Sequence, residues 1–354
     1  MNIVTQICGF MLLMLLYVFI RSQKSLGLYE DRIFLYVLCT TMVSLVLDIM
    51  SVLLIIYSDY FPEAIVIAVA KLYVSMLTWD GWMAFVYMML DVVPERVHRR
   101  FVGRMATFNL CITAVTLLLP IETHYDGNLE LYTDGPSTIV VYASAALYSA
   151  LIIISVIIER KKINPRKLLG MVVWVAFLVG AAVIQFFFKE LLIITFAMAL
   201  GVLIIFVLME NPERNIDRNL GCFNSYAKSV YYNKLWDKKT PFSVLKVSFS
   251  SGIFTAGVYE NEFALFRTLL EFIDREASVY VFKENDLSLV IVADDSKKAE
   301  NLGNSIITGF FKNPEERANV SAMFIGSPYL LESAADIDRI FAFADEGSLT
   351  TAGG

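Results

Sequence analysis

Three ionisable side chains interrupt long apolar runs and are the first candidates for chemistry: Asp48, Lys71 and Asp80. A charge inside a bilayer is costly, so such residues face a bundle interior or water and often mark a functional site. Counted from the same end of their apolar runs, Asp48 and Lys71 lie at depths that agree within a few ångströms, at about 1.5 Å per helical residue. We therefore predict a buried ion pair between them.

Several interpretations of this intramembrane site stay open. An ion pair between Asp48 and Lys71 could be purely structural, with no ligand, or it could belong to a sensing or ion-linked site. The third alternative is that the two residues make no contact. Asp80 lies in the sequence WDGW, between Trp79 and Trp82. It is expected either to line a polar cavity near the inner leaflet or to lie in a packed helix interface.

Metal chemistry has little support in the sequence. The chain has only two histidines and four cysteines, and the cysteine spacing matches neither a disulfide framework nor a metal site. The acidic segment 121–137 could bind a cation or could simply be solvated; its candidate ligands are Glu122, His124, Asp126, Glu130 and Asp134. We expect no resident metal and no cofactor.

The elements that must position the intramembrane residues are transmembrane helices. Of the 354 residues 57% are hydrophobic, and the mean hydropathy is +0.62. A helix needs about 20 mostly apolar residues to cross a bilayer. We predict an α-helical membrane bundle of about seven spans within residues 1–210, at 3–20, 33–57, 64–90, 105–120, 138–158, 168–188 and 191–209.

Basic residues in the loops predict the orientation of this bundle. Twelve Lys and Arg residues lie in the first, third and fifth loops, whereas the intervening loops carry only Lys189. Basic loops face the cytosol, so we expect a multi-pass protein of the cell (plasma or inner) membrane with its N-terminus outside. An odd number of spans then places residues 211–354 in the cytoplasm. The net charge of −6 gives no reason to expect a nucleic-acid partner.

The pattern changes after residue 217 from apolar runs to alternating helices and strands. Helices are predicted at 217–236, 259–275, 296–311 and 334–345, and strands at 242–249, 278–283, 287–293 and 319–326. The second and third strands form a hairpin joined by Glu284, Asn285 and Asp286. This set of elements predicts a small α+β domain at 211–354, large enough for its own core.

Short motifs in this domain carry a family resemblance. In the opening DRNLGCFNSYA, residues Asp217, Gly221, Phe223 and Asn224 match the family's motif of an aspartate before Leu-Thr-Gly-Leu-Tyr-Asn-Arg, whereas Ser225 replaces its arginine. Ile325–Gly326 are similar to its Ser-Ile-Gly strand, and residues 344–347 to its final Ala-Asp stretch. The domain thus resembles a GGDEF domain, the fold of bacterial diguanylate cyclases, which implies a central, mostly antiparallel sheet. The whole chain is similar to bacterial seven-span sensors with regulatory output domains.

The same resemblance implies that the catalytic residues are missing. Cyclases hold a magnesium–triphosphate with an aspartate pair on the first strand, where this chain has Lys246 and Ser248. The signature Gly-Gly-Asp/Glu-Glu-Phe corresponds to Lys283, Glu284, Asn285, Asp286 and Leu287. Only Asp286 keeps an acid near the metal position, and side chains replace the glycines that let a nucleotide approach the backbone. We expect no catalytic residue here.

These observations favour a noncatalytic membrane signalling protein linked to cyclic di-GMP. Its expected partners are the lipid bilayer and, through the degenerate domain, a second copy of the chain or another GGDEF-type protein. A diguanylate cyclase with residual or altered nucleotide activity is the alternative. A transporter or channel with a regulatory tail is a third hypothesis, motivated by the three intramembrane charges.

Overall fold

The computed structural model describes residues 3–23, 25–93, 95–125, 131–161, 163–188, 191–210, 215–255 and 259–351. The chain divides into two compact units, Met1–Asn211 and Pro212–Gly354. Some residues used in the sequence predictions lie outside the described ranges, namely Lys24, Asp126, Glu130, Lys162 and Lys189.

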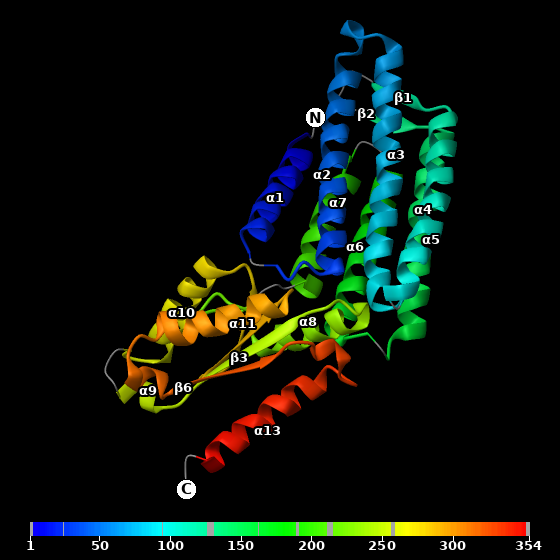
Figure 1. The fold of residues 1–354 in the computed structure, drawn as a ribbon. Coiled ribbons are helices and arrows are strands. Elements are labelled where there is room, and N and C mark those ends of the chain that lie inside the picture. Colours follow the sequence, from blue (N-terminus) through cyan, green and yellow to red (C-terminus); the bar gives the residue numbers. More distant parts are fainter. Residues whose placement is uncertain are drawn as a thin grey trace. The chain divides into compact units, whose positions relative to one another are not determined.

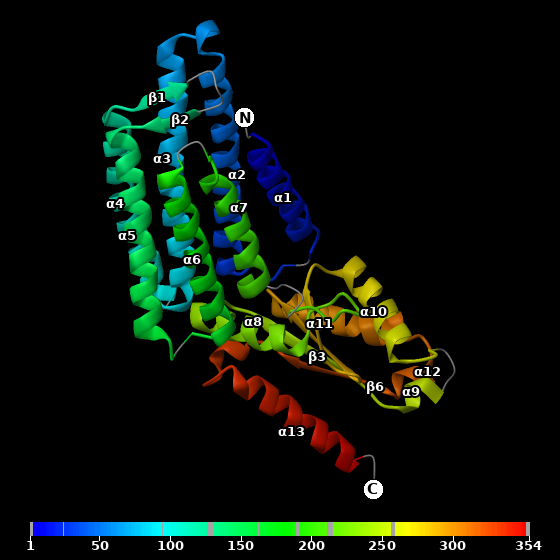
Figure 2. The same cartoon turned by 180° about the vertical axis from the view of Figure 1, so that it is seen from behind.

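The first unit is a bundle of long apolar helices (Figures 1 and 2). Six helices of the described chain are long and apolar enough to cross a membrane. They are α1 (Ile3–Ser22), α2 (Tyr29–Ile56), α3 (Glu63–Met88), α4 (Glu95–Leu118), α5 (Pro136–Glu159) and α6 (Pro165–Phe187). The protein is therefore a multi-pass membrane protein.

The predicted seventh span is shorter than the other six. Helix α7 (Ile194–Ile205) continues as the π-helical turn η3 (Phe206–Glu210), and together they form an apolar helix over Ile194–Glu210 that falls below the length of the others. The fourth predicted span, 105–120, also differs, because α4 begins ten residues earlier at Glu95. The polar first turns of α4 are helical although they are not apolar, which a hydropathy window cannot detect.

Short elements connect these helices. Two single-turn 3-10 helices, η1 (Ser58–Tyr60) and η2 (Met89–Asp91), follow α2 and α3. Strands β1 (Glu122–Tyr125) and β2 (Leu131–Asp134) form an antiparallel pair between α4 and α5.

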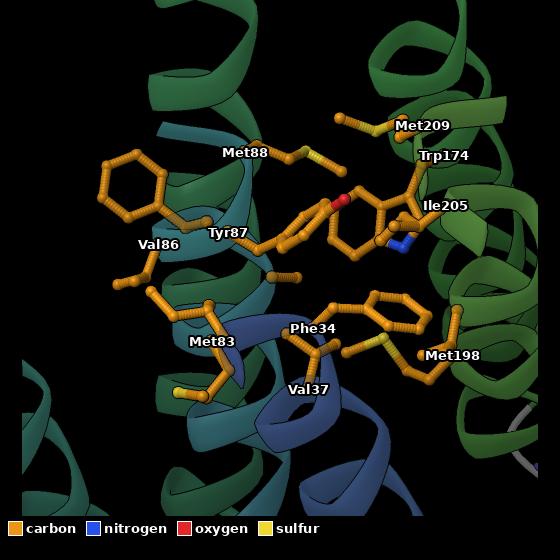
Figure 3. Close-up of a cluster of buried hydrophobic side chains, with 14 of the residues drawn as sticks. Phe34, Val37, Met83, Val86, Tyr87, Met88, Trp174, Met198, Ile205 and Met209 are labelled. Carbon is orange, nitrogen blue, oxygen red and sulfur yellow. The ribbon is translucent and has the colours of Figure 1, made fainter. Parts of the chain in front are cut away.

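The core of the bundle forms where α2, α3, α6 and α7 meet. Figure 3 shows Phe34, Tyr87, Trp174, Met198 and Ile205 converging from these four helices. Many outward side chains are apolar too, such as Met11 and Leu15 on α1, which are 66% and 72% exposed. An apolar exterior around an apolar core is what a bundle surrounded by lipid requires.

The second unit is built on a four-stranded antiparallel sheet with the order β4-β5-β3-β6. Its strands are β3 (Ser243–Phe249), β4 (Tyr280–Asn285), β5 (Ser288–Ala293) and β6 (Val320–Ile325). Each strand alternates its side chains between two faces. On one face Leu245 and Val247 pack in a core with Leu265, Phe266 and Leu302.

Helices cover both faces of this sheet. The first face carries α10 (Glu262–Glu276) and α11 (Ser296–Asn304), which η5 (Ser305–Phe310) extends. On the opposite face, Tyr231 of α8 (Ser225–Lys238) contacts the Phe282 ring, and Phe341 of α13 (Ala335–Thr351) lies over Lys246. Short helices α9 (Gly252–Thr255), α12 (Pro314–Arg317) and η6 (Pro328–Leu330) complete the unit.

Several predicted boundaries in this unit were wrong; α13, predicted to end at residue 345, runs to Thr351. The helix predicted from 217 starts at Ser225, because residues 217–222 form a turn in which Asp217 caps the N–H groups of Asn219 and Leu220. Asn224 then caps α8 by accepting a hydrogen bond from Ala227 N. The predicted hairpin linker is also displaced, since β4 runs to Asn285 and the two-residue turn consists of Asp286 and Leu287.

Candidate functional site

The strongest candidate site is a group of charged side chains on the sheet face covered by α8 and α13. Lys246 lies on this face of β3, directly opposite Val290 of β5 and Met323 of β6. Glu284 lies beside it near the end of β4, where the pairing with β5 shifts register between Lys283 and Asn285. A bulge of this kind re-aims side chains at a sheet edge.

Four residues from four elements form this group, here called the ion cluster: Lys228, Lys246, Glu284 and Asp338. Lys228 Nζ donates to Glu284 Oε1 at 2.5 Å and to Asp338 Oδ1 at 2.9 Å. Lys246 Nζ lies 3.1 Å from Glu284 Oε2. The Ser288 hydroxyl donates to the same oxygen at 3.3 Å, so both oxygens of Glu284 are engaged.

The ion cluster is buried and electrically balanced. The side chains of Lys228, Lys246 and Glu284 are 3%, 8% and 17% exposed, whereas Asp338 at the edge is 46% exposed. Two ammonium groups face two carboxylates, which is the condition for keeping charges inside a protein. Aromatic rings complete the surroundings, with Tyr232 beside Lys228 and Phe341 beside Lys246.

Glu284 is held in its charged form by this environment. Burial alone would raise the pKa of its carboxyl, but the hydrogen bonds and positive charges of Lys228 and Lys246 outweigh burial and hold the pKa below its ordinary value. The cluster is therefore a set of fixed internal ion pairs near neutral pH, with no proton to exchange at Glu284.

This arrangement is poorly suited to metal binding. A hard divalent cation takes six or more oxygen ligands and favours carboxylates, whereas here an ammonium group already occupies each side of the Glu284 carboxylate. In the parts of the chain that the structure describes, no group of three or more His, Cys, Asp or Glu side chains could hold a metal ion.

The remaining hairpin residues lie apart from the ion cluster. Lys283 points to the other face, 2.9 Å from Asp286 and 3.9 Å from Asp217. Burial alone would lower the pKa of Lys283, but these carboxylates raise it above its ordinary value. Asn285 accepts a hydrogen bond from Leu287 N within the turn.

The hydroxyl of Ser248 is buried and makes no hydrogen bond to a described residue. Ser248 also lies on β3, opposite Ser288 and Ser321. Of the seven hairpin and strand positions singled out from the sequence, Lys246 and Glu284 are the two that belong to the ion cluster.

Sequence reasoning missed two members of the ion cluster, Lys228 and Asp338. Lys228 lies on α8 one turn before Tyr232, so a lysine on the apolar side of a helix was a signal that could have been noticed. Asp338 lies on α13 between Ile337 and Arg339 and gives no comparable signal, because acidic residues in a first helical turn are common for dipole reasons.

The predicted ion pair between Asp48 and Lys71 was wrong. Asp48 on α2 is 1% exposed and accepts a hydrogen bond from Thr195 of α7, while Gln6 and Tyr73 also interact with its carboxylate. Lys71 Nζ instead donates to the carbonyl oxygen of Leu117, on α4, at 2.8 Å. The depths predicted for the two residues agree, but the residues face different neighbours, because depth alone does not give the direction around a helix axis.

Asp80 lies in the packed interface of α2 and α3. It is 2% exposed, and Ser44 and Thr40 of α2 are polar neighbours that interact with it. Neither carboxylate oxygen has a hydrogen-bond partner among the described residues.

The acidic segment 121–137 forms no cation site among its described residues. Glu122 and His124 lie on β1, with a distance of 3.7 Å between Glu122 Oε2 and His124 Nε2, and both side chains are substantially exposed. Asp134 at the end of β2 accepts a hydrogen bond from Gly135 N at 2.8 Å.

Taken together, fold and site define a class: a multi-pass helical membrane protein with a second unit built on a small antiparallel sheet that contains a buried ion cluster. No protein-family model matches the chain, and no curated protein matches it in sequence.

Proposed function

We propose that this protein is a noncatalytic membrane signalling protein of bacterial type, whose second unit is a degenerate GGDEF-type domain. The ion cluster is the observation that carries this proposal. Where the resemblance expects carboxylates that hold a magnesium–triphosphate, Lys246 presents an ammonium group 3.1 Å from Glu284. An ammonium group at that point repels the metal and neutralises the nearest acid.

The order of elements supports the same proposal. Strand β3 is followed by α10, the β4–β5 hairpin, α11, β6 and α13, which is the order that the motif resemblance requires. The signature positions fall on the hairpin, and the Ile325–Gly326 motif falls at the end of β6.

In this proposal the second unit acts by pairing with another protein. The proposed partner is a second copy of the chain or an active GGDEF-type protein in cyclic di-GMP signalling. The proposed orientation has the N-terminus outside the cell membrane and the second unit in the cytoplasm, in keeping with the basic residues of the odd-numbered loops.

Nucleotide binding tests the proposal directly. The full-length protein in lipid nanodiscs is titrated with GTP and magnesium by calorimetry, and incubated samples are examined for cyclic di-GMP, with an active diguanylate cyclase as the positive control. We expect neither micromolar binding nor product. Micromolar GTP binding would overturn the claim that the site is inactive and would favour the alternative of a diguanylate cyclase with residual or altered activity.

Pairing is tested separately. Mass photometry of the same nanodisc sample, alone and with an active GGDEF-type protein, is expected to show a homodimer or a mixed complex. A protein that stays monomeric and does not bind the active GGDEF-type protein would contradict the pairing mechanism. That outcome would not affect the conclusion from the nucleotide-binding experiment.

A further inference from the structure

The membrane bundle contains a cavity lined by residues of α3, α5, α6 and α7 and by the end of β2. Its volume is about 250 Å³. A cavity of roughly 150 Å³ lined by apolar side chains is known to admit a benzene-sized ring. By proportion, the cavity here has room for a molecule of about ten non-hydrogen atoms.

The lining of the cavity is mostly apolar and aromatic. Tyr73, Tyr148 and Trp174 contribute rings from three different helices, and Met198 contributes its thioether from α7. Among the described lining residues, Asp134 is the only acidic one and none is basic. Asp134 lies at the β2 end and already accepts a hydrogen bond from Gly135 N. Such a lining favours an uncharged, largely apolar molecule over an ion.

Polar groups along the lining have partners within the bundle. Gln185 Oε1 accepts from Ile193 N and Ile194 N at 2.9 and 3.0 Å, and the Tyr148 hydroxyl donates to Asn109 Oδ1 at 2.9 Å. A ligand therefore needs neither a charge nor several hydrogen-bonding groups to fill the cavity.

We infer that this cavity is a binding site for an uncharged, mostly apolar molecule of one or two rings. The inference goes beyond the proposed function, which leaves the stimulus open. It uses no residue of the ion cluster, so the two can fail independently.

The position of the cavity gives ligand binding a direct structural consequence. Trp174 and Met198 line the cavity and also belong to the core at the meeting point of α2, α3, α6 and α7 (Figure 3). A molecule that touches these side chains therefore stabilises the packing of α7, the last helix before the second unit.

A fluorinated aromatic probe tests the site in the whole protein. The probe is 5-fluoroindole, an uncharged two-ring molecule with one N–H donor, and its fluorine resonance is recorded with full-length protein in lipid nanodiscs and with empty nanodiscs. We expect a saturable bound resonance that appears only with the protein and that excess indole displaces. The same resonance in empty nanodiscs, or none with the protein, would overturn the inference.

A pair of variants on one helix localises the binding. Ala182 lines the cavity from α6, whereas Ala176 lies six residues earlier on α6 in an aliphatic groove against α5. We expect Ala182→Phe to weaken probe binding at least about tenfold by filling the cavity, and Ala176→Phe to leave the affinity within about twofold. Equal effects of the two variants would place the probe elsewhere and contradict the site.

Competition by indene, the hydrocarbon analogue of indole, tests the apolar character of the site in the unmodified protein, even if Ala182→Phe does not fold. We expect indene to displace the probe with an affinity within about fivefold of that of indole. Failure of indene to displace the probe at concentrations at which indole does so would contradict a mostly apolar site.

Discussion

At the scale of single residues, charge balance determines which substitutions the second unit accepts without a loss of stability. Glu284 is shared by Lys228 and Lys246, and the exposed edge of the cluster is closed by Asp338. A buried ion pair contributes little net stability compared with an apolar replacement of both partners, but removing one partner leaves an uncompensated charge in the interior. The cluster should therefore be sensitive to single substitutions.

Lys228→Met keeps the length of the side chain and removes its charge. We expect it to lower the free energy of unfolding of the second unit by about 2–3 kcal/mol, since Glu284 keeps only Lys246 and Asp338 loses its partner in the cluster. Hydrogen exchange of the β3 and β5 amides in the full-length protein measures this effect.

Arg267→Met is the matched control, because Arg267 is 70% exposed in a pair with Glu271 and should change stability by under about 0.5 kcal/mol. Equal hydrogen-exchange rates in Lys228→Met and Arg267→Met would mean that the ion cluster does not contribute to the stability of the second unit.

Glu284 also gives the second unit a defined response to acid. Because the pKa of folded Glu284 lies below its ordinary value of 4.5, the stabilisation is complete above about pH 4.5 and is lost as the pH falls through the folded pKa. Glu284→Gln lacks the stabilisation that the charged carboxylate contributes, so the variant should melt at a lower temperature than the parent protein at pH 7. The difference between the two melting temperatures should shrink as the pH falls below about 4.5 and through the lowered pKa of folded Glu284. A difference that stays constant with pH would show that the Glu284 charge is not linked to folding.

Sequence reasoning at this scale identified positions better than partners. Comparison with the family motifs drew attention to Lys246, as the replacement of a metal ligand, and to Glu284, as a side chain in place of a glycine. The contact between them became visible only in the folded sheet. Lys228 is 56 residues from Glu284 and Asp338 is 110 residues from Lys228. Ion pairs between residues so far apart in sequence depend on how the helices pack on the sheet. A short sequence pattern does not contain that information.

At the scale of elements, close packing of α6 and α7 depends on one glycine. A Cβ atom at Gly201 of α7 would lie 2.6 Å from Trp174 Nε1 of α6, which is closer than such atoms normally approach. Small residues at helix interfaces let membrane helices pack tightly, and Trp174 in turn lies in the core shown in Figure 3.

Gly201→Ala should therefore destabilise the bundle by about 1–3 kcal/mol, because Trp174 must move from a packed position. The measurement is the thermal unfolding midpoint of the detergent-solubilised protein. Gly180→Ala on α6 is the control, since a Cβ atom there meets no heavy atom within 4 Å and alanine favours a helix. A midpoint that falls equally, or in neither variant, would contradict tight packing at Gly201.

Periodicity and hydropathy predicted most elements but not all of their ends. The strands at 242–249, 278–283, 287–293 and 319–326 correspond to β3, β4, β5 and β6, because alternation along a half-buried strand is a local signal. The start of α8 was missed because a hydrogen-bonded turn at Asp217 competes with helix over the same residues. The start of α4 was missed because its first turns are polar.

At the scale of the whole molecule, the side of the membrane on which the second unit lies depends on whether α7 crosses. The apolar helix Ile194–Glu210 has 17 residues at most, which spans about 25 Å at 1.5 Å per residue. A hydrocarbon core is about 30 Å thick, and spans of about 17 residues are the shortest observed. A short helix can still cross by local thinning of the bilayer.

Cysteine labelling decides between six crossings and seven. Ser58 begins η1, between α2 and α3, and Ser251 follows β3 in the second unit; both are exposed. Each is replaced by cysteine and treated in cells with a membrane-impermeant maleimide, with the unmodified protein as background for its four native cysteines. With seven crossings and basic loops inside, we expect Ser58→Cys to react in intact cells and Ser251→Cys only after permeabilisation. Labelling of both in intact cells would mean that α7 does not cross, and the second unit would then have no access to cytoplasmic partners.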